Sequence, residues 1–331
     1  MKKLFLSLVV AVVVATATYA QNTLVATLTH GEDITMYYGT YALRDAYEAA
    51  VNGDVINLSG GAFQPVTITK AITLRGAGID AETPTYILNN LYINIPAEET
   101  GRFLMEGVRC SYYLSLQGQC ANPYFLKCQF RQISCSSDTS IGNALFADCK
   151  ITESFSLDGN SSVQFVNCYV SNFINHAESA SACFANCIIT PPSGYIIESI
   201  SNSQLFNSVI FNYNGFDGGS RLPDTSAATN CVVVGLSNCF ASQANANCKN
   251  ATAEELFKSY TGEYSDEQTF ELTDAAKLNY LGSDGTQVGL YGGMMPYTST
   301  PSYPQITKLN VANKTTPDGK LSVEIEVNAV Q

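Results

Sequence analysis

Hydrophobic residues recur in one short phrase along the middle of the chain, at a spacing close to twenty residues. Each copy has an aromatic or apolar residue, then often Asn or Asp before a Cys, and an apolar residue two positions after that Cys. Seven copies place this Cys position, filled in some copies by another small residue, at 108, 128, 149, 168, 187, 208 and 231. A steady period over seven copies is typical of a solenoid with one coil per repeat.

Each phrase predicts two short strands joined by a tight corner. In one copy Phe165 faces inward, Asn167 forms the corner, and Cys168 and Val170 face inward on the next strand. Asn tolerates the left-handed backbone region that such a corner needs, and its amide can bond its equivalents in neighbouring coils. We therefore expect a ladder of corner side chains, with Asp148 as a variant: Asn167, Asn186, Asn207 and Asn230.

A third apolar set follows each phrase by a few residues, as at Ile133, Phe155 and Phe173. Three strands per coil, each pairing with its equivalents above and below, predict three parallel sheets around a narrow interior. Connections between parallel strands are strongly right-handed. The expected fold class is therefore all-β, a right-handed parallel β-helix solenoid. Leucine-rich repeats share the period but need several Leu per repeat, which this sequence lacks.

Two short helices are predicted outside the repeats. Residues 43–50 place Leu43, Ala46, Tyr47 and Ala50 on one helical face that ends near Gly53, and we expect this helix to cap the N-terminal end of the solenoid. Further along, the capping box of residues 252–255 predicts a helix that runs to about residue 260.

The C-terminal part changes in character after residue 293. Three prolines between 294 and 304 predict a linker, and two apolar runs at 306–311 and 321–327 predict a β-hairpin. One face of this hairpin requires burial, and a lone hairpin is marginal in water, so we expect it to dock on the solenoid's flank or on a partner. The predicted domains are a signal peptide (1–20), a β-helix domain with N-terminal cap (21–293), a linker (294–304) and a hairpin tail (305–331).

The repeat and its two flanks resemble the right-handed parallel β-helix superfamily, often called pectin-lyase-like, and in particular a secreted bacterial member. The resemblance is carried by three stretches: the entry helix and glycine at 43–54, the first strands at 55–76, and the closing segment at 270–293. Many members of this superfamily are polysaccharide lyases, hydrolases or esterases. The resemblance therefore implies the fold and makes catalysis on polysaccharides an alternative to weigh.

The first twenty residues predict export. A charged start, an apolar run from Leu4 to Ala15 and small residues before Ala20 are typical of a secretory signal cleaved after Ala20. The run is too short for a comfortable membrane span, so we expect a protein of the periplasm, outer surface or medium that does not span the membrane. The formal charge of −12 argues against nucleic acid or an anionic membrane as a partner.

Cysteine is unusually frequent, with eleven residues. No C-x-x-C pair exists, so a zinc site is disfavoured, and we predict an interior row of small apolar side chains. A disulfide between Cys239 and Cys248, which lie outside this row, would be compatible with export. The predicted structural ladder comprises five repeat positions: Cys128, Cys149, Cys168, Cys187 and Cys231.

The sequence offers no evident catalytic group, metal site or cofactor site. The two outward rows beside the cysteines contain no carboxylate, whereas a lyase or hydrolase needs acidic residues gathered on one face. Of the two histidines, His30 precedes the solenoid, and His176 has no Ser–Asp set at a matching spacing.

The outward rows divide into a basic half and an apolar half. Arg109, Arg131 and Lys150, with Tyr169 at their edge, predict a stripe that suits an acidic glycan. The apolar half needs a cover, for which we expect the insertion at 212–227 or the C-terminal hairpin. This half comprises Ile188, Val209, Phe211, Val232 and Val234.

The function that these patterns favour is an exported, non-catalytic β-helix module that binds an acidic polysaccharide or another cell-surface component. One alternative is a divergent polysaccharide lyase or glycoside hydrolase whose site is built from loops. A second alternative is a purely structural surface protein.

Overall fold

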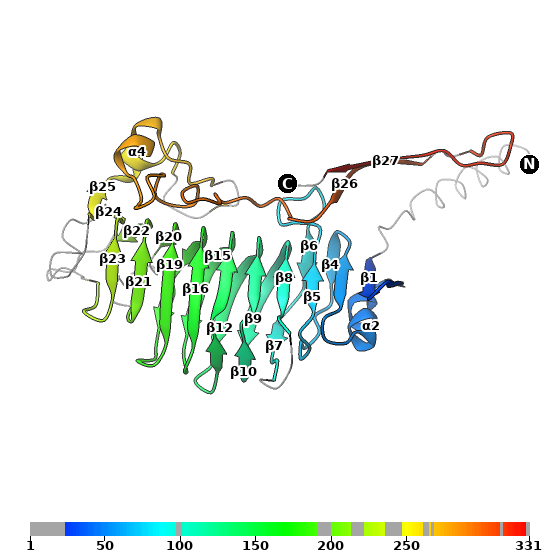
Figure 1. Ribbon diagram of the computed structural model, residues 1–331, viewed down its shortest axis with the longest axis horizontal. Coiled ribbons are helices and arrows are strands. Elements are labelled where there is room, and N and C mark those ends of the chain that lie inside the picture. Colours follow the sequence, from blue (N-terminus) through cyan, green and yellow to red (C-terminus); the bar gives the residue numbers. More distant parts are fainter. Residues whose placement is uncertain are drawn as a thin grey trace, which may run out of the picture.

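The chain folds into a parallel β-solenoid of about eight turns, seen here in a computed structural model (Figure 1). The structure describes residues 24–96, 101–190, 200–212, 222–235, 247–260, 265, 268–311 and 314–328. The predicted signal peptide and Cys239 lie outside these ranges. The described part is mostly β, with three short helices, so the predicted parallel β-solenoid is confirmed.

One long sheet, called sheet A, has eleven strands in the order β2-β1-β3-β5-β8-β11-β14-β16-β19-β21-β23. Its strands pair in parallel except at one end, where β1 is antiparallel to both β2 and β3. The bounds are β1 (Val25–His30), β2 (Asp33–Tyr38), β3 (Val55–Leu58), β5 (Thr73–Arg75), β8 (Leu104–Glu106), β11 (Tyr124–Leu126), β14 (Ala144–Ala147), β16 (Ser162–Val166), β19 (Ser181–Ala185), β21 (Ser203–Phe206) and β23 (Ala227–Thr229).

The second long sheet, sheet B, has the order β25-β24-β22-β20-β17-β15-β12-β9-β6-β4, with β7 and β18 joined to β9 and β15. All of its pairs are parallel, and its strands follow those of sheet A after each corner. The bounds are β4 (Gly61–Phe63), β6 (Thr85–Ile87), β7 (Leu91–Ile93), β9 (Val108–Leu116), β12 (Gln129–Cys135), β15 (Lys150–Leu157), β17 (Tyr169–Ser171), β18 (Phe173–Asn175), β20 (Ile188–Thr190), β22 (Val209–Asn212), β24 (Val232–Gly235) and β25 (Lys249–Ala251).

A third sheet is much shorter than predicted. Within the described solenoid, the third sheet consists of two strands, β10 (Gln119–Ala121) and β13 (Ser140–Gly142), which pair with each other. Ile133 and Phe155 are buried as expected, but they lie in the far halves of β12 and β15. A register shift after Phe130 lets these long strands turn the corner without a break, so the second and third predicted strands are one strand.

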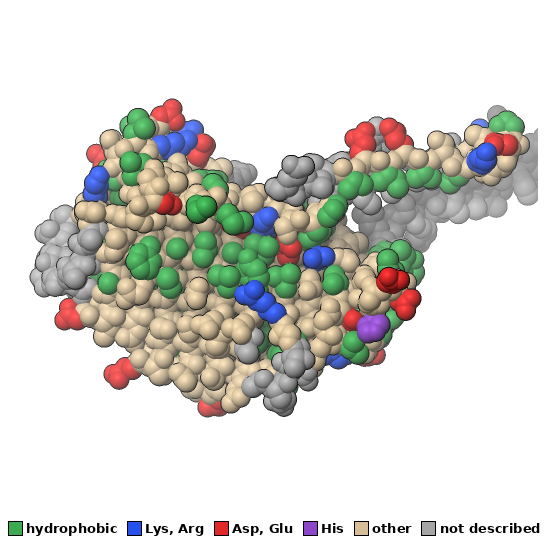
Figure 2. All heavy atoms as spheres, viewed as in Figure 1, with side chains coloured by type: hydrophobic (Ala, Val, Ile, Leu, Met, Phe, Trp, Pro, Cys, Tyr) green, Lys and Arg blue, Asp and Glu red, His purple; other side chains and the backbone are tan. Residues whose placement is uncertain are grey.

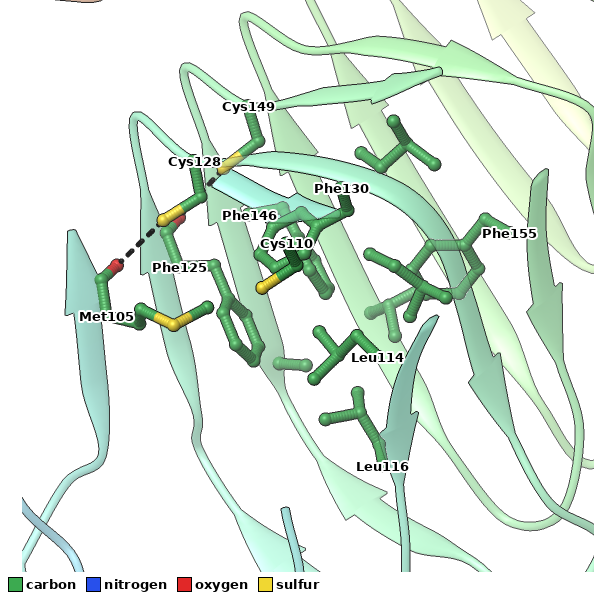
Figure 3. Packing of buried hydrophobic residues seen from close by; sticks show 14 of the residues in the cluster. Met105, Cys110, Leu114, Leu116, Phe125, Cys128, Phe130, Phe146, Cys149 and Phe155 are labelled. Atoms are coloured by element: carbon green, nitrogen blue, oxygen red, sulfur yellow. Dashed lines mark hydrogen bonds between the residues drawn. The ribbon is translucent and has the colours of Figure 1, made fainter. Parts of the chain in front are cut away.

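The interior is filled by stacked side chains, one per coil (Figure 3). Phe125, Phe146 and Phe165 stack with ring centroids 4.6 and 5.3 Å apart. Beside them runs the cysteine row, whose five members Cys128, Cys149, Cys168, Cys187 and Cys231 are all fully buried. Their thiols donate to main-chain carbonyls, as Cys168 Sγ does to Phe146 O and Val166 O at 3.3 and 3.2 Å.

The corner residues adopt the left-handed backbone conformation that the sequence predicts. Their φ angles lie between 51° and 53°, and the set also includes the lysine of the preceding coil: Lys127, Asp148, Asn167, Asn186, Asn207 and Asn230. Their side chains, however, do not bond one another as we expected. Asn167 Nδ2 donates to Leu290 O and Gly292 O at 2.7 and 2.9 Å, and Asn207 Oδ1 accepts from Ser283 N at 2.9 Å.

These corner contacts hold a C-terminal segment, residues 281–303, which we call the strap. It runs back along the corners, against the direction in which the coils advance (Figure 1). Near its end, Lys127 Nζ donates to Thr300 O at 2.7 Å, and Ser302 N donates to Glu106 Oε1 at 2.6 Å. Residues 294–304, predicted as a linker, are therefore bonded to the solenoid.

One corner residue beside the strap, Asp148, is a buried carboxyl group that we expect to respond to pH. Burial raises the pKa of Asp148 to about 7, against the opposing effects of Lys127 and a backbone hydrogen bond from Thr298. An aspartate in the unfolded chain titrates near 3.8, so the folded protein holds this proton more tightly. The stabilisation by this proton is therefore fully present below about pH 4 and is lost as the pH rises towards 7.

We expect Asp148→Asn to remove this loss. The free energy of unfolding, measured with urea between pH 4 and pH 8, should decline in the wild type and should decline less in the variant. Asp224→Asn, which changes a carboxylate away from the strap, is the control. Equal pH profiles for the wild type and Asp148→Asn would show that this carboxyl group does not sense pH.

The N-terminal helix is present as α2 (Ala42–Ala49), and its predicted face is buried: Leu43, Ala46, Tyr47 and Ala50. Figure 1 shows α2 beside β1 at one end of the solenoid. The last strand of sheet A at this end is β2, a strand that the sequence patterns did not indicate. The sheet edge is therefore formed by β2 and not by the helix.

The apolar half of sheet B is covered by the described residues of the segment 253–291, namely 253–260 and 268–291. This segment contains α3 (Ala253–Leu256), which has the predicted capping box, and α4 (Asp274–Asn279). Phe257, Phe270 and Leu290 pack on the buried strip of Ile188, Val209, Phe211, Val232 and Val234. We expected the 212–227 insertion or the C-terminal hairpin to cover the strip, and the hairpin does not do so. Residues 213–221 of the insertion lie outside the described part.

The predicted C-terminal hairpin is confirmed as β26 (Gln305–Val311) and β27 (Val323–Asn328), an antiparallel pair. It projects away from the coils in Figure 1. Residues 321–327 are all exposed, so the described part of β27 is not docked on the solenoid's flank.

Candidate functional site

The predicted basic stripe lies on the outer face of sheet B. Arg109 pairs with Gln129, which pairs with Lys150, which pairs with Tyr169, so these positions are one coil apart in a single row. Arg131 stands at the register shift in β12 and does not belong to this row.

The cations of the stripe already have partners. Asp80, from the loop between β5 and β6, lies 3.3 Å from Arg109 Nη2 and 3.9 Å from Lys150 Nζ. Arg109 also donates from Nε to Ile79 O, and the Arg109 and Lys150 side chains are 17% and 12% exposed. Arg131 is paired with Glu153. The row therefore presents little free positive charge to a ligand.

Tyr169 is covered rather than presented. The side chain is 3% exposed, its ring stacks on Phe270 with centroids 5.0 Å apart, and its hydroxyl lies 3.1 Å from Thr190 Oγ1. Burial raises the pKa of Tyr169 above its ordinary value. A sugar cannot rest on this ring, because the Phe270 ring already occupies its face.

Between the stripe and the strap remains a cavity of about 190 Å³. Asp80, Lys150 and Tyr169 form one side of it, and Phe270, Tyr291 and Tyr297 are among the residues that close the other. Its volume lies below the roughly 300 Å³ at which ligand pockets usually begin, so it is too small for a polysaccharide chain.

A larger and more open groove lies on the outer side of sheet A, at the turns that precede β8, β11 and β14. It has a volume of about 400 Å³ and spans successive coils along the solenoid axis. We call it the Arg102 groove, and its lining comprises Gly101, Arg102, Asn122, Asn143, Leu145 and Gln164.

Repetition of the coil places the polar groups of this groove in a line. Asn122 and Asn143 occupy equivalent turns with φ of 50° and 55°, and both are exposed. Arg102 stands at the turn before them, with its guanidinium 4.6 Å from the centre of the Tyr124 ring and Nε donating to Asn122 O at 3.3 Å. The ring contact and this hydrogen bond hold the guanidinium at the groove, where its remaining donors can reach a ligand.

The described lining of the groove is polar and hydrogen-bonding in character. Among the described residues, its lining has amide and guanidinium groups and no carboxylate, histidine or cysteine, the side chains that usually act as a general acid or base. Within the described ranges there is no cluster of three or more His, Cys, Asp or Glu residues that would hold a metal ion.

One acid–base pair exists elsewhere. His30 Nδ1 lies 2.7 Å from Asp54 Oδ1 at the end of β1, a contact that the sequence did not indicate. Asp54 also accepts from Val51 N at 2.8 Å and so fixes the turn after α2. Among the described residues, no hydroxyl or thiol bonds the His30 ring as the nucleophile of a catalytic triad would.

Sequence reasoning missed the Arg102 groove because its residues lie outside the cysteine phrase. The available signal was Asn122 and Asn143, two asparagines at one-coil spacing ahead of the next strand. Sequence reasoning also missed Asp80 as the partner of Arg109 and Lys150. Asp80 precedes both cations by at least 29 residues in the chain, so no local pattern connects them.

The structure therefore shows a parallel β-solenoid with an open polar groove beside sheet A. Comparison with protein-family models, with curated proteins and with solved structures gives no match. Among the described residues, no helix is both long and apolar enough to span a membrane.

Proposed function

We propose that this protein is an exported, non-catalytic β-solenoid module that binds a glycan chain along the Arg102 groove. The observation that carries the proposal is the line of amide and guanidinium side chains, one per coil, in an open groove that follows the solenoid axis. Planar amides and Arg hydrogen-bond neighbouring sugar hydroxyls or carboxylates, and a regular spacing of such groups suits a regular polymer.

The alternatives receive less support. A lyase or hydrolase needs acidic residues beside the substrate, and the described part of the groove lining contains none. A purely structural role would not require an open polar groove whose guanidinium is held in place by an aromatic ring. Arg102 is the one cation among the described lining residues, so the expected ligand is neutral or sparsely charged rather than densely sulfated.

We expect Arg102→Ala to weaken glycan binding about ten- to hundredfold, the usual effect of one lost hydrogen bond to a charged group. Binding of neutral and uronic-acid oligosaccharides would be screened on an array and then measured by calorimetry. Asn143→Ala should weaken the same ligand by a smaller factor. Arg44→Ala, which changes an exposed arginine on α2, should leave the affinity unchanged.

Three outcomes would contradict the proposal. They are the absence of any glycan ligand for the wild type, equal affinities for the Arg102→Ala and Arg44→Ala variants, and release of shortened or unsaturated products from the ligand. The third outcome would favour the enzyme alternative.

A further inference from the structure

Two rows of large apolar side chains are exposed, and both lie on β-strands. The first row is on β27, where Val323, Ile325 and Val327 are 50%, 54% and 57% exposed. They alternate with polar residues, so they share one face of the β26–β27 ribbon, and Figure 2 shows hydrophobic side chains along one side of it. A two-stranded ribbon with an exposed apolar face is marginal in water by itself.

The second row is on β2, where Ile34, Met36 and Tyr38 are 64%, 56% and 61% exposed. The register pairs Met36 with Thr27, while the buried Ala26 and Leu28 of β1 pair with Tyr37 and Thr35. The exposed row therefore lies on the outer face of sheet A. No described strand pairs with the outer edge of β2.

The strap brings these two rows to the same end of the molecule. Ser302 is bonded to Glu106, and the Tyr303 ring lies 5.3 Å from the Arg75 guanidinium, so the ribbon starts beside the first coils. Figure 1 shows the ribbon extending past the end of the solenoid that carries β1 and α2. It leaves its own β2 row exposed.

We propose that two copies of this chain pair end to end, and that the apolar face of each β26–β27 ribbon covers the β2 row of the other copy. Because both rows lie at one end, the contact can be reciprocal about a two-fold axis and closes at two copies. The two faces would pack as two β-layers, and Glu324 and Glu326, which alternate with the apolar row of β27, would stay in solvent.

The exposed area is sufficient for such a dimer. Each of the six apolar side chains offers roughly 100 Å², so two copies would bury about 1,200 Å², the lower limit of stable specific interfaces. The formal charge of −12 on each chain opposes the approach of two copies. Added salt should therefore strengthen the dimer, by screening this repulsion while the apolar contact persists.

The test is the mass of the exported chain in solution, by sedimentation equilibrium at micromolar concentrations. We expect a dimer for the wild type, and at least a tenfold weaker dimer for Ile325→Glu and for Met36→Glu. Glu326→Gln changes the other face of the ribbon and should leave the dimer intact. All three substituted side chains are exposed, so the midpoint of thermal unfolding should be unchanged. That measurement distinguishes loss of the dimer from loss of folding.

Mixing the two glutamate variants distinguishes this arrangement from others. The Ile325→Glu copy keeps a good β2 row and the Met36→Glu copy keeps a good ribbon, so an equal mixture should form heterodimers more tightly than either variant alone. Ribbon-on-ribbon pairing would instead leave Met36→Glu fully dimeric and would overturn the proposal. A monomeric wild type, or an open series of polymers, would overturn it as well.

Discussion

Cys168→Asp is expected to abolish cooperative folding of the solenoid. Cys168 is fully buried in the middle of the cysteine row, and its thiol donates to two main-chain carbonyls. A carboxylate at this position would face the same two oxygen atoms, which can only accept hydrogen bonds. Cys149 N donates to Cys168 Sγ at 3.4 Å, but one main-chain donor would leave the buried charge largely unpaired, at a cost of several kcal/mol.

The matched control is Cys168→Ser, because the chain already uses serine in this row. Ser208 occupies the equivalent position two coils on, is fully buried, and donates from Oγ to Phe206 O at 2.8 Å. Cys168→Ser should therefore unfold in urea within about 2 kcal/mol of the wild type. Circular dichroism of the Asp variant should show lost β structure at neutral pH, and a native spectrum with an unchanged urea midpoint would contradict the burial of this row.

The features that the sequence predicts well are those set by neighbouring residues. Alternation around Phe165 and Cys168 gives the inward face of two strands, and a repeat near twenty residues stacks them. The corner conformation at Asn167 follows from the tolerance of Asn for positive φ. The helix at 42–49 follows from its apolar face and the glycine after it, and α3 follows from its capping box.

The features that the sequence did not predict depend on contacts between distant residues. The strap binds the corners through main-chain carbonyls such as Leu290 O and Thr300 O, which every residue possesses and no pattern reveals. Its three prolines indicate a linker when considered locally. The sequence predicts the basic stripe as an open surface because it does not reveal the partners of the stripe residues. Only the tertiary structure places Asp80 beside Arg109, Glu153 beside Arg131 and Phe270 on Tyr169.

This distinction also bears on function. The repeat determines which positions face outward, but the strap and residues 253–291 determine which of those positions meet solvent. They cover the apolar part of sheet B and leave the turns ahead of sheet A open, where Arg102 and Asn143 lie. A search for binding residues in such a solenoid has to start from the uncovered side.

Phe270→Ala is expected to release the cover from sheet B. The Phe270 side chain is 3% exposed, stacks on Tyr169 and meets Phe257 edge-on at 5.7 Å. Removing a buried phenyl ring typically costs 3–5 kcal/mol, roughly the lost burial plus the cavity left behind. Residues 253–291 would then open before the coils unfold, because the Phe and Cys stacks of the coils do not include this ring.

Dye binding and limited proteolysis check this result. The Phe270→Ala variant should bind a hydrophobic dye at temperatures where the wild type does not, and a protease should cut it within residues 253–303 while the coils stay intact. Leu278→Ala is the control in the same segment, because that side chain is 77% exposed. Its free energy of unfolding should equal that of the wild type within about 0.5 kcal/mol.

A second variant, Phe270→Gly, uses the backbone conformation. Phe270 has a φ of +54°, a conformation that costs a non-glycine residue about 1 kcal/mol or more. Phe270→Gly should therefore be no less stable than Phe270→Ala, and a cover that stays closed in both variants would show that this ring does not hold it.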